Sequence, residues 1–252
     1  WPVVVAARAS DPVVVVTGNN RVVAVSGPAR ADGVRAGMRR REAQGRCPTA
    51  EVITHDEAAD ARAFETVVAA VEELCPRVEV VRPGVLAFAS RGPSRYFGGD
   101  AALLERIRSR VCEAVRDLLH LAVGLGPTVG VADGNLAASL AARAATSARD
   151  QLLVVPPGRS AEFLAPMPVD AIGNAAIADV ARRLGLRTLG AFAALSVSDV
   201  VGRFGADGVA AHRRANGLEV RSLATREPPP ELSVEVSFDP PAETVDRIAF
   251  AA

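Results

Sequence analysis

Short valine-rich runs separated by turn residues mark the first part of the chain as β structure. The runs Pro12–Val16 and Arg21–Val25 flank Thr17-Gly18-Asn19-Asn20, and Gly and Asn are typical of hairpin turns. A second pair of β-rich runs spans Val78–Phe88 and flanks Pro83-Gly84. Proline fixes φ and glycine accepts positive φ, so this dipeptide predicts a tight turn.

Helical periodicity surrounds the second hairpin. Thr54-His55-Asp56-Glu57 has capping-box spacing and predicts a helix that runs to about Leu74, with Ala61, Phe64, Val68, Val71 and Leu74 on one face. Asp100 is a candidate cap for a second helix, whose apolar stripe is Leu104, Ile107, Val111, Val115 and Leu118. A strand is expected at Leu121–Leu125. Helix, hairpin, helix and strand in this order predict an α+β fold with helices on one face of a small antiparallel sheet.

The remaining pattern is an alanine-rich helix, a short strand and then small helices. The helix is expected at Asn135–Ala148 and the strand at Gln151–Val155, and Pro156-Pro157-Gly158 is the main predicted domain boundary. Short helices are predicted at Ala175–Leu184, Leu189–Leu195, Val197–Arg203 and Gly208–Asn216. Pro228-Pro229-Pro230 breaks the chain again, and Leu232–Phe238 is expected to be a strand that opens a further domain.

Composition narrows the class of protein. Apolar residues make up 49% of the 252 residues, and no apolar run reaches the ~20 residues of a membrane span. The three cysteines lack metal-ligand spacing, which favours reduced thiols in an intracellular protein. All 29 basic residues are Arg, and many fall between Arg30 and Arg46 or between Arg182 and Arg226. These two segments indicate either contact with a polyanion or ordinary solvated helix faces.

The order of several motifs resembles the Y-family DNA polymerases. The segments that carry the similarity are Arg21–Met38, Glu42–Pro48, Val129–Ala141, Leu164–Val169 and Leu184–Gly190. The resemblance implies a right-hand polymerase fold with an antiparallel-sheet palm and a thumb of helix-hairpin-helix elements. It implies four parts: fingers and N-terminal palm elements at 1–54, palm at 55–158, thumb at 159–227, and a linker with the start of a little finger at 228–252.

Departures from the family pattern imply that catalysis is lost. The family carries an Asp-Glu pair at the hairpin tip, where this chain has Pro83-Gly84 after Arg82. Two family lysines correspond to Asn135 and Ser139, and an aromatic residue of the fingers corresponds to Gly27. No metal or other cofactor is therefore expected. Trp1 is not a start methionine, and the family's remaining carboxylates would lie on a strand before it.

The resemblance also implies which residues touch DNA. In the thumb, the second hairpin offers Arg203, Gly205 and Gly208, followed by Arg213 and Arg214. Glycines there could let the backbone approach a phosphate, although an ordinary helix-turn-helix would look the same. The first hairpin reads Ile172-Gly173-Asn174 where the family has Gly-x-Gly, which argues against close approach of its backbone to a phosphate. Arg182, Arg183 and Arg187 are candidate DNA contacts near it. Arg30 is the candidate in the fingers.

Within the family, the chain most resembles the ImuB-like branch, partly through Ser94-Arg95-Tyr96-Phe97-Gly98-Gly99-Asp100. That branch implies a cytoplasmic, nucleoid-associated bacterial adaptor in the SOS response. Its implied partners are primer-template DNA, a sliding clamp, an error-prone C-family polymerase and a RecA-like accessory subunit, with recruiting segments beyond the little finger. Two alternatives stay open: an active polymerase that rebuilds its metal site, with Glu79 as the nearest carboxylate, or an interaction module that no longer touches DNA.

Other candidate residues favour structural roles. His55, His120 and His212 share no ligand spacing and are expected to be structural or solvated. The acidic cluster Asp56, Glu57 and Asp60 could suggest a metal, but the first turn of a helix favours anions for electrostatic reasons. Tyr96 and Phe97 could stack on a base or a partner ring, and burial of the pair is the favoured expectation.

Overall fold

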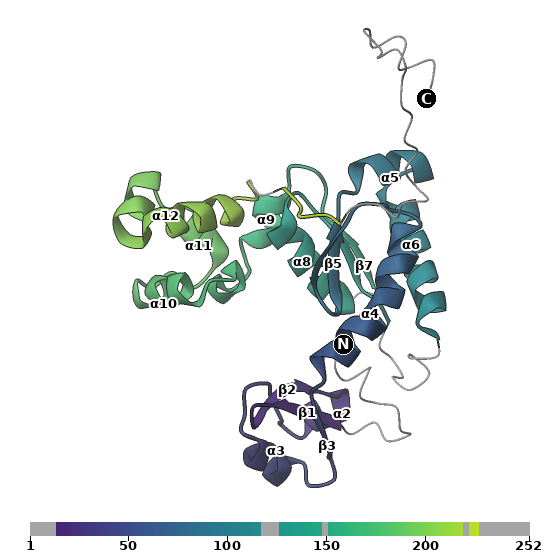
Figure 1. Ribbon diagram of the computed structural model, residues 1–252. Coiled ribbons are helices and arrows are strands. Elements are labelled where there is room, and N and C mark those ends of the chain that lie inside the picture. The colour runs from purple at the N-terminus through teal and green to yellow at the C-terminus, as the bar shows by residue number, and fades with distance from the viewer. Residues whose placement is uncertain (1–13, 117–125, 148–150, 219–221, 227–252) are drawn as a thin grey trace, which may run out of the picture.

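The computed structural model describes residues 14–116, 126–147, 151–218 and 222–226, which form three groups of elements (Figure 1). Residues 14–54 form a small sheet with two helices, here called the N-terminal unit. Residues 57–155 supply two long helices and two strand pairs, the central unit. Residues 160–218 are helical, the C-terminal unit. The strands expected at Leu121–Leu125 and Leu232–Phe238, and residues Leu118 and His120, lie outside the described residues.

The N-terminal unit is a three-stranded sheet in the order β2-β1-β3. Strands β1 (Val14–Gly18) and β2 (Arg21–Val25) are antiparallel, and β3 (Glu51–Thr54) is parallel to β1. Asn19 and Asn20 form the predicted turn with φ of 50° and 60°, a conformation that asparagine tolerates better than most residues. Helices α2 (Gly27–Ala31) and α3 (Arg40–Arg46) complete the unit around buried Val22, Val25, Ala29, Val34, Ala43 and Cys47.

The first long helix of the central unit, α4, spans Glu57–Glu72. Its cap is Asp56, whose carboxylate accepts a hydrogen bond from the Ala59 amide at 2.9 Å, so the capping box predicted from Thr54 is wrong. Thr54 instead ends β3. The predicted face is buried at Phe64, Val68 and Val71, whereas Ala61 is exposed.

The second long helix, α6, spans Asp100–Ala114. Its N-cap is Gly99, which corrects the expectation that Asp100 caps it; the Asp100 carboxylate accepts from the Ser94 hydroxyl instead. A short helix that the sequence did not predict, α5 (Arg91–Phe97), precedes it. Helices α4 and α6 pack together over a core of Phe64, Val67, Val68, Val71, Cys75, Val78, Leu103, Ile107, Val111 and Val115.

Two separate strand pairs lie beside these helices. Strands β4 (Val78–Arg82) and β5 (Val85–Phe88) form the predicted antiparallel hairpin. Strands β6 (Val129–Val131) and β7 (Leu152–Val154) are parallel, so the expected antiparallel pairing holds for only one of these pairs. Helix α8 (Asn135–Ala144), followed by a 3₁₀ turn η1 (Ala145–Ser147), packs on β6 and β7. The predicted α+β class is confirmed.

The C-terminal unit is a cluster of short helices. Its elements are α9 (Ser160–Leu164), the 3₁₀ turn η2 (Val169–Ile172), α10 (Ala175–Arg183), α11 (Leu189–Ala193) and α12 (Val197–Ala215). Helix α12 is broken at Gly205, whose φ of 64° and ψ of −159° suit glycine alone, and this break separates the two helices predicted there. Fully buried Phe192 lies in the core and contacts Phe204 edge-on at 5.2 Å between ring centroids.

Asp133 joins the central and C-terminal units across the predicted Pro156-Pro157-Gly158 boundary. Its carboxylate accepts from the Gly158 amide at 2.7 Å, and its own amide donates to the hydroxyl of buried Ser160 at 3.0 Å. Together with a hydrogen bond from the Ser160 hydroxyl to the Asp133 carboxylate at 3.3 Å, these contacts tie Gly158 and Ser160 to the turn that precedes α8. Among the helices that the structure describes, none is long and apolar enough to cross a membrane.

Candidate functional site

The tip of the β4–β5 hairpin carries no carboxylate. Pro83 and Gly84 form its two-residue turn, and Gly84 has φ of 87°, as the third position of a type II turn requires. Gly84 and Arg82 are both exposed. The tip therefore presents an exposed glycine next to the positively charged side chain of Arg82, and no acidic group.

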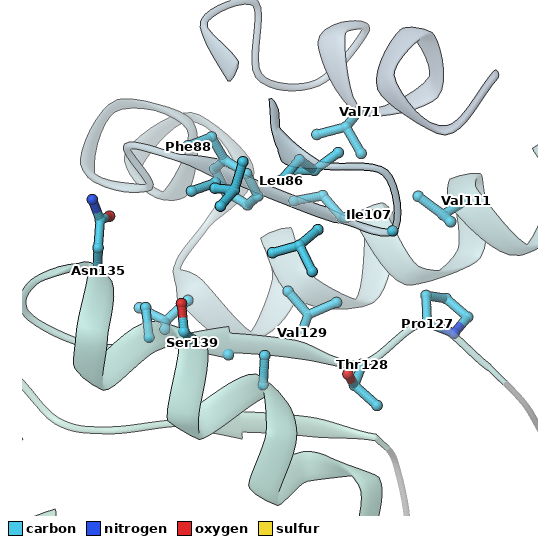
Figure 2. Close-up of a pocket in the computed structure, with 18 of the residues that line it drawn as sticks. Val71, Leu86, Phe88, Ile107, Val111, Pro127, Thr128, Val129, Asn135 and Ser139 are labelled. Carbon is cyan, nitrogen blue, oxygen red and sulfur yellow. The ribbon is translucent and has the colours of Figure 1, made fainter. Parts of the chain in front are cut away.

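A cavity of about 740 Å³ lies between β5 and the β6–α8 layer, beside α4 and α6 (Figure 2). Gly84, Asn135 and Ser139, three positions singled out from the sequence, line this one cavity, together with Arg82. Asn135 and Ser139 lie one turn apart on α8, and Figure 2 shows both on the side of the helix that faces β5. Pro83 and Gly27 are not among the lining residues.

The polar groups around the cavity do not suit a divalent cation. They are Arg82, Ser90, Thr128, Asn135, Ser139 and Arg143, and no described lining residue is an Asp or Glu. Mg²⁺ prefers carboxylate oxygens, and two guanidinium groups at the wall oppose a cation electrostatically. Over the described ranges, no group of three or more His, Cys, Asp and Glu side chains could hold a metal. The residues present thus fit an anionic or uncharged ligand better than a metal.

Arg143 is a cavity residue that the sequence analysis missed. It follows Asn135 and Ser139 at intervals of four along α8, so helical spacing would have placed all three on one face. The remainder of the wall is largely apolar and includes Val71, Leu86, Phe88, Ile107, Val111 and Val129, which Figure 2 shows as sticks.

Glu79, the carboxylate considered for a rebuilt metal site, is used elsewhere. It is buried on β4 with 9% of its surface exposed, and its Oε2 accepts a hydrogen bond from the Ala224 amide at 2.9 Å. It does not line the cavity. Its neighbour Val78 accepts from the Arg226 amide at 2.8 Å. Glu79 therefore helps to hold the segment 222–226 on the edge of β4.

Arg226 fastens the same segment to helix α4. Its guanidinium donates to both carboxylate oxygens of Glu65 and lies 3.9 Å from Glu72. The pKa of Arg226 is raised above its usual value, mainly by the hydrogen bond to Glu65. The chain after the C-terminal unit thus returns to the central unit, a contact across 161 positions that no local sequence signal predicts.

The basic residues of the C-terminal unit fall into two groups. Arg182 and Arg183 pair with Asp179, at 3.4 and 2.6 Å, and Arg182 also lies 3.6 Å from Asp170. Arg203 pairs with Asp199, whose pKa is lowered by the Ser196 hydroxyl and then by Arg203. Within the described part of the chain, by contrast, Arg187, Arg213 and Arg214 make no ion pair.

The glycines of the second hairpin also differ from one another. Gly205 is exposed at the break in α12, where its backbone conformation departs from that of the helix. Gly208 is buried, and an added Cβ would lie 2.1 Å from Phe204 Cβ, so packing inside the unit accounts for this glycine. In the first hairpin, Gly173 has φ of 79°, and the Asn174 side chain accepts from the Ala176 and Ile177 amides as the cap of α10.

The remaining sequence candidates have local roles. Gly27 begins α2 and Arg30 lies one turn later, both exposed in the N-terminal unit. His55 contacts the buried Asp60 carboxylate at 2.8 Å, where β3 meets α4. His212 Nε2 lies 2.9 Å from the Ala193 carbonyl. Tyr96 corrects the expectation that the Tyr96–Phe97 pair is buried, because its side chain is 83% exposed.

Comparison with known proteins gives a consistent assignment. The model of the impB/mucB/samB family matches residues 3–143, more than half of the chain. A protein named DNA polymerase IV from Methanoculleus marisnigri is 30% identical over 232 residues, covering 91% of this chain and 61% of that protein. The protein named ImuB from Caulobacter vibrioides is 28% identical over 222 residues, covering 87% of this chain and 45% of its own length.

Solved structures share the fold. The post-insertion binary complex of Dbh DNA polymerase matches with a TM-score of 0.66 at 17% identity, over 87% of this chain and 64% of that one. This chain spans less than two thirds of each of these relatives. The family match over residues 3–143 and the fold together show that the chain belongs to the impB/mucB/samB family of Y-family polymerase domains.

Proposed function

We propose that this protein is a non-catalytic Y-family polymerase homologue that binds primer-template DNA and serves as an adaptor in translesion synthesis. The proposal takes residues 1–54 as fingers with N-terminal palm elements, 55–158 as palm, 159–227 as thumb, and 228–252 as the linker and start of a little finger. Its place of action would be the bacterial cytoplasm at the nucleoid. Its protein partners would be a sliding clamp, an error-prone C-family polymerase and a RecA-like subunit, during the SOS response.

One observation carries the non-catalytic half of the proposal: the cavity beside the β4–β5 hairpin is lined by Arg82 and Arg143 and by no described carboxylate. Two-metal phosphoryl transfer needs acidic ligands that hold cations and offset the charge of the transferring phosphate. Asn135 and Ser139 supply neutral groups where the family resemblance implies lysines. Loss of such charge stabilisation raises the activation barrier by several kcal/mol, which is about the cost of removing one group that stabilises transition-state charge in an enzyme.

A second candidate, an active translesion polymerase, is favoured by the relative named DNA polymerase IV from Methanoculleus marisnigri. That alternative needs carboxylates from another part of the full-length protein. Glu79 is a poor source, because its carboxylate is buried and accepts from the Ala224 amide.

Primer extension separates the two functions. The full-length protein would be incubated with a labelled primer-template, all four deoxynucleotides, and Mg²⁺ or Mn²⁺, with DNA binding measured in the same buffer. We expect no nucleotide incorporation above the protein-free level while the DNA stays bound. Incorporation above that level by the purified protein would overturn the proposal, and absence of both binding and synthesis would favour an interaction module that has lost DNA contact.

A further inference from the structure

Tyr96 is the most exposed large hydrophobic side chain of the described residues, at 83%. Its ring meets Phe97 edge-on, with centroids 4.8 Å apart and an interplanar angle of 88°. The Arg106 guanidinium from α6 lies 5.3 Å from the centroid of the Phe97 ring. Phe97 thus contacts both the Arg106 guanidinium and the Tyr96 ring, while Tyr96 itself is largely exposed to solvent.

Helix α5, which carries Tyr96 near its C-terminal end, is fastened there to the start of α6. Helix α5 ends in a left-handed residue, Gly98, with φ of 89°, and Gly99 follows with φ of 117°. The Gly99 amide donates to the Ser94 carbonyl at 2.7 Å, and the buried Ser94 hydroxyl donates to the Asp100 carboxylate at the start of α6. A side chain presented on so constrained a helix end loses little backbone entropy when it binds a partner.

The surface around Tyr96 is positively charged. Arg91 and Arg95 lie one turn apart on α5, Arg106 lies beside Phe97, and all three are exposed. None of them forms an ion pair with any residue in the described part of the chain. The neighbouring acids are already engaged, since Asp100 accepts from Ser94 and Glu105 accepts two hydrogen bonds from Arg108 at 3.1 and 2.7 Å. The charges of these arginines are therefore available to an external anion.

This patch lies apart from the surfaces proposed to bind DNA. In Figure 1, α5 sits at the end of the central unit remote from α10 and α12 and from the N-terminal sheet. Exposed tyrosine flanked by arginine is the composition that dominates binding energy at protein–protein interfaces. We propose that Arg91, Arg95, Tyr96 and Arg106, the α5 patch, dock an acidic segment of a partner protein that carries apolar side chains between its carboxylates. The inference rests on the adaptor function only in requiring a protein partner.

The proposal can be tested with a defined probe. The full-length protein would be titrated into a fluorescein-labelled synthetic peptide in which Asp and Glu surround a leucine and a phenylalanine. Fluorescence anisotropy would report binding, and a peptide with Asn and Gln at the acidic positions would report the need for charge. Tyr96→Ala and Arg95→Glu test the patch, Tyr96→Phe keeps the ring, and the double substitution of Arg213 and Arg214 by Glu is the control for general loss of positive charge.

We expect Tyr96→Ala to weaken binding of the acidic peptide by about tenfold, as truncation of an interface anchor does, and Arg95→Glu to do the same or more. Tyr96→Phe and the Arg213/Arg214 variant should bind as the wild type does. The proposal fails if the acidic peptide does not bind, or binds Tyr96→Ala and Arg95→Glu unchanged. It also fails if labelled oligothymidylate shows the same dependence on Tyr96, because the patch would then be a nucleic-acid surface. Primer extension tests the non-catalytic function independently of these peptide titrations, so that function and the docking of an acidic segment can fail separately.

Discussion

Replacing Gly130 with alanine should destabilise the protein by about 3 kcal/mol or more, because overpacking against backbone cannot be relieved by a side-chain rotation. Gly130 is the middle residue of β6, where the strand lies directly against α8. A Cβ there would lie 2.2 Å from the Ala142 amide nitrogen and 2.7 Å from the Ala138 carbonyl oxygen. Urea denaturation followed by circular dichroism measures the effect.

Gly45→Ala is the matched control for this substitution. Gly45 lies in α3, has no atom within 4 Å of an added Cβ, and does not have a positive φ. Its replacement should change stability by no more than about 1 kcal/mol, in the stabilising direction expected for glycine to alanine in a helix. Similar unfolding midpoints for the two variants would contradict the close approach of β6 to α8, and with it the placement of Asn135 and Ser139 beside the hairpin.

Reversing the charges of Arg213 and Arg214 should largely abolish DNA binding. They follow the break at Gly205 on the same helix, and within the described residues they form no ion pair, unlike Arg182, Arg183 and Arg203. Each phosphate neutralised releases counterions, so loss of two contacts should lower the slope of log affinity against log salt by roughly 1–2. Anisotropy with a labelled primer-template at several salt concentrations measures both quantities.

The control is the double substitution of Arg91 and Arg95 by Glu, which changes net charge equally on the α5 patch. This variant should bind the primer-template with nearly the wild-type affinity and salt slope. Equal losses in the two variants would indicate a general electrostatic effect and not a DNA-binding surface on the C-terminal unit. Unchanged binding in the Arg213/Arg214 variant would favour the interaction module that has lost DNA contact.

Local signals in the sequence predict most of the elements near the site. Pro83-Gly84 specifies a type II turn by its own backbone preferences, so the hairpin and the absence of acids at its tip are readable from the sequence. The helical spacing of apolar residues in α4 and α6 likewise predicts which face of each helix is buried. Helix α5 could not be predicted in this way, because glycine and proline at Gly92 and Pro93 are typical of a turn. The helix nevertheless forms there, since proline is tolerated in a first helical turn.

Features that depend on distant partners could not be predicted in the same way. Strand β3 has only four residues and exists through parallel pairing with β1, more than thirty positions away. Nothing in the sequence near Glu79 indicates a partner for its carboxylate. Only the folded chain shows that residues 222–226 pack beside β4, where the Glu79 carboxylate accepts a hydrogen bond from the Ala224 amide. Likewise, the arginines of the C-terminal unit look equivalent until their acidic neighbours are placed in space.

Direct measurement of divalent cation binding tests the central claim, that the proposed palm offers no acidic ligands for a metal pair. Electron paramagnetic resonance of Mn²⁺, titrated into the full-length protein with primer-template and a deoxynucleotide, counts the ions bound beyond those held by DNA and nucleotide alone. We expect no additional bound Mn²⁺. Stoichiometric binding by the protein, removed by substitution of one of its own carboxylates, would contradict the account.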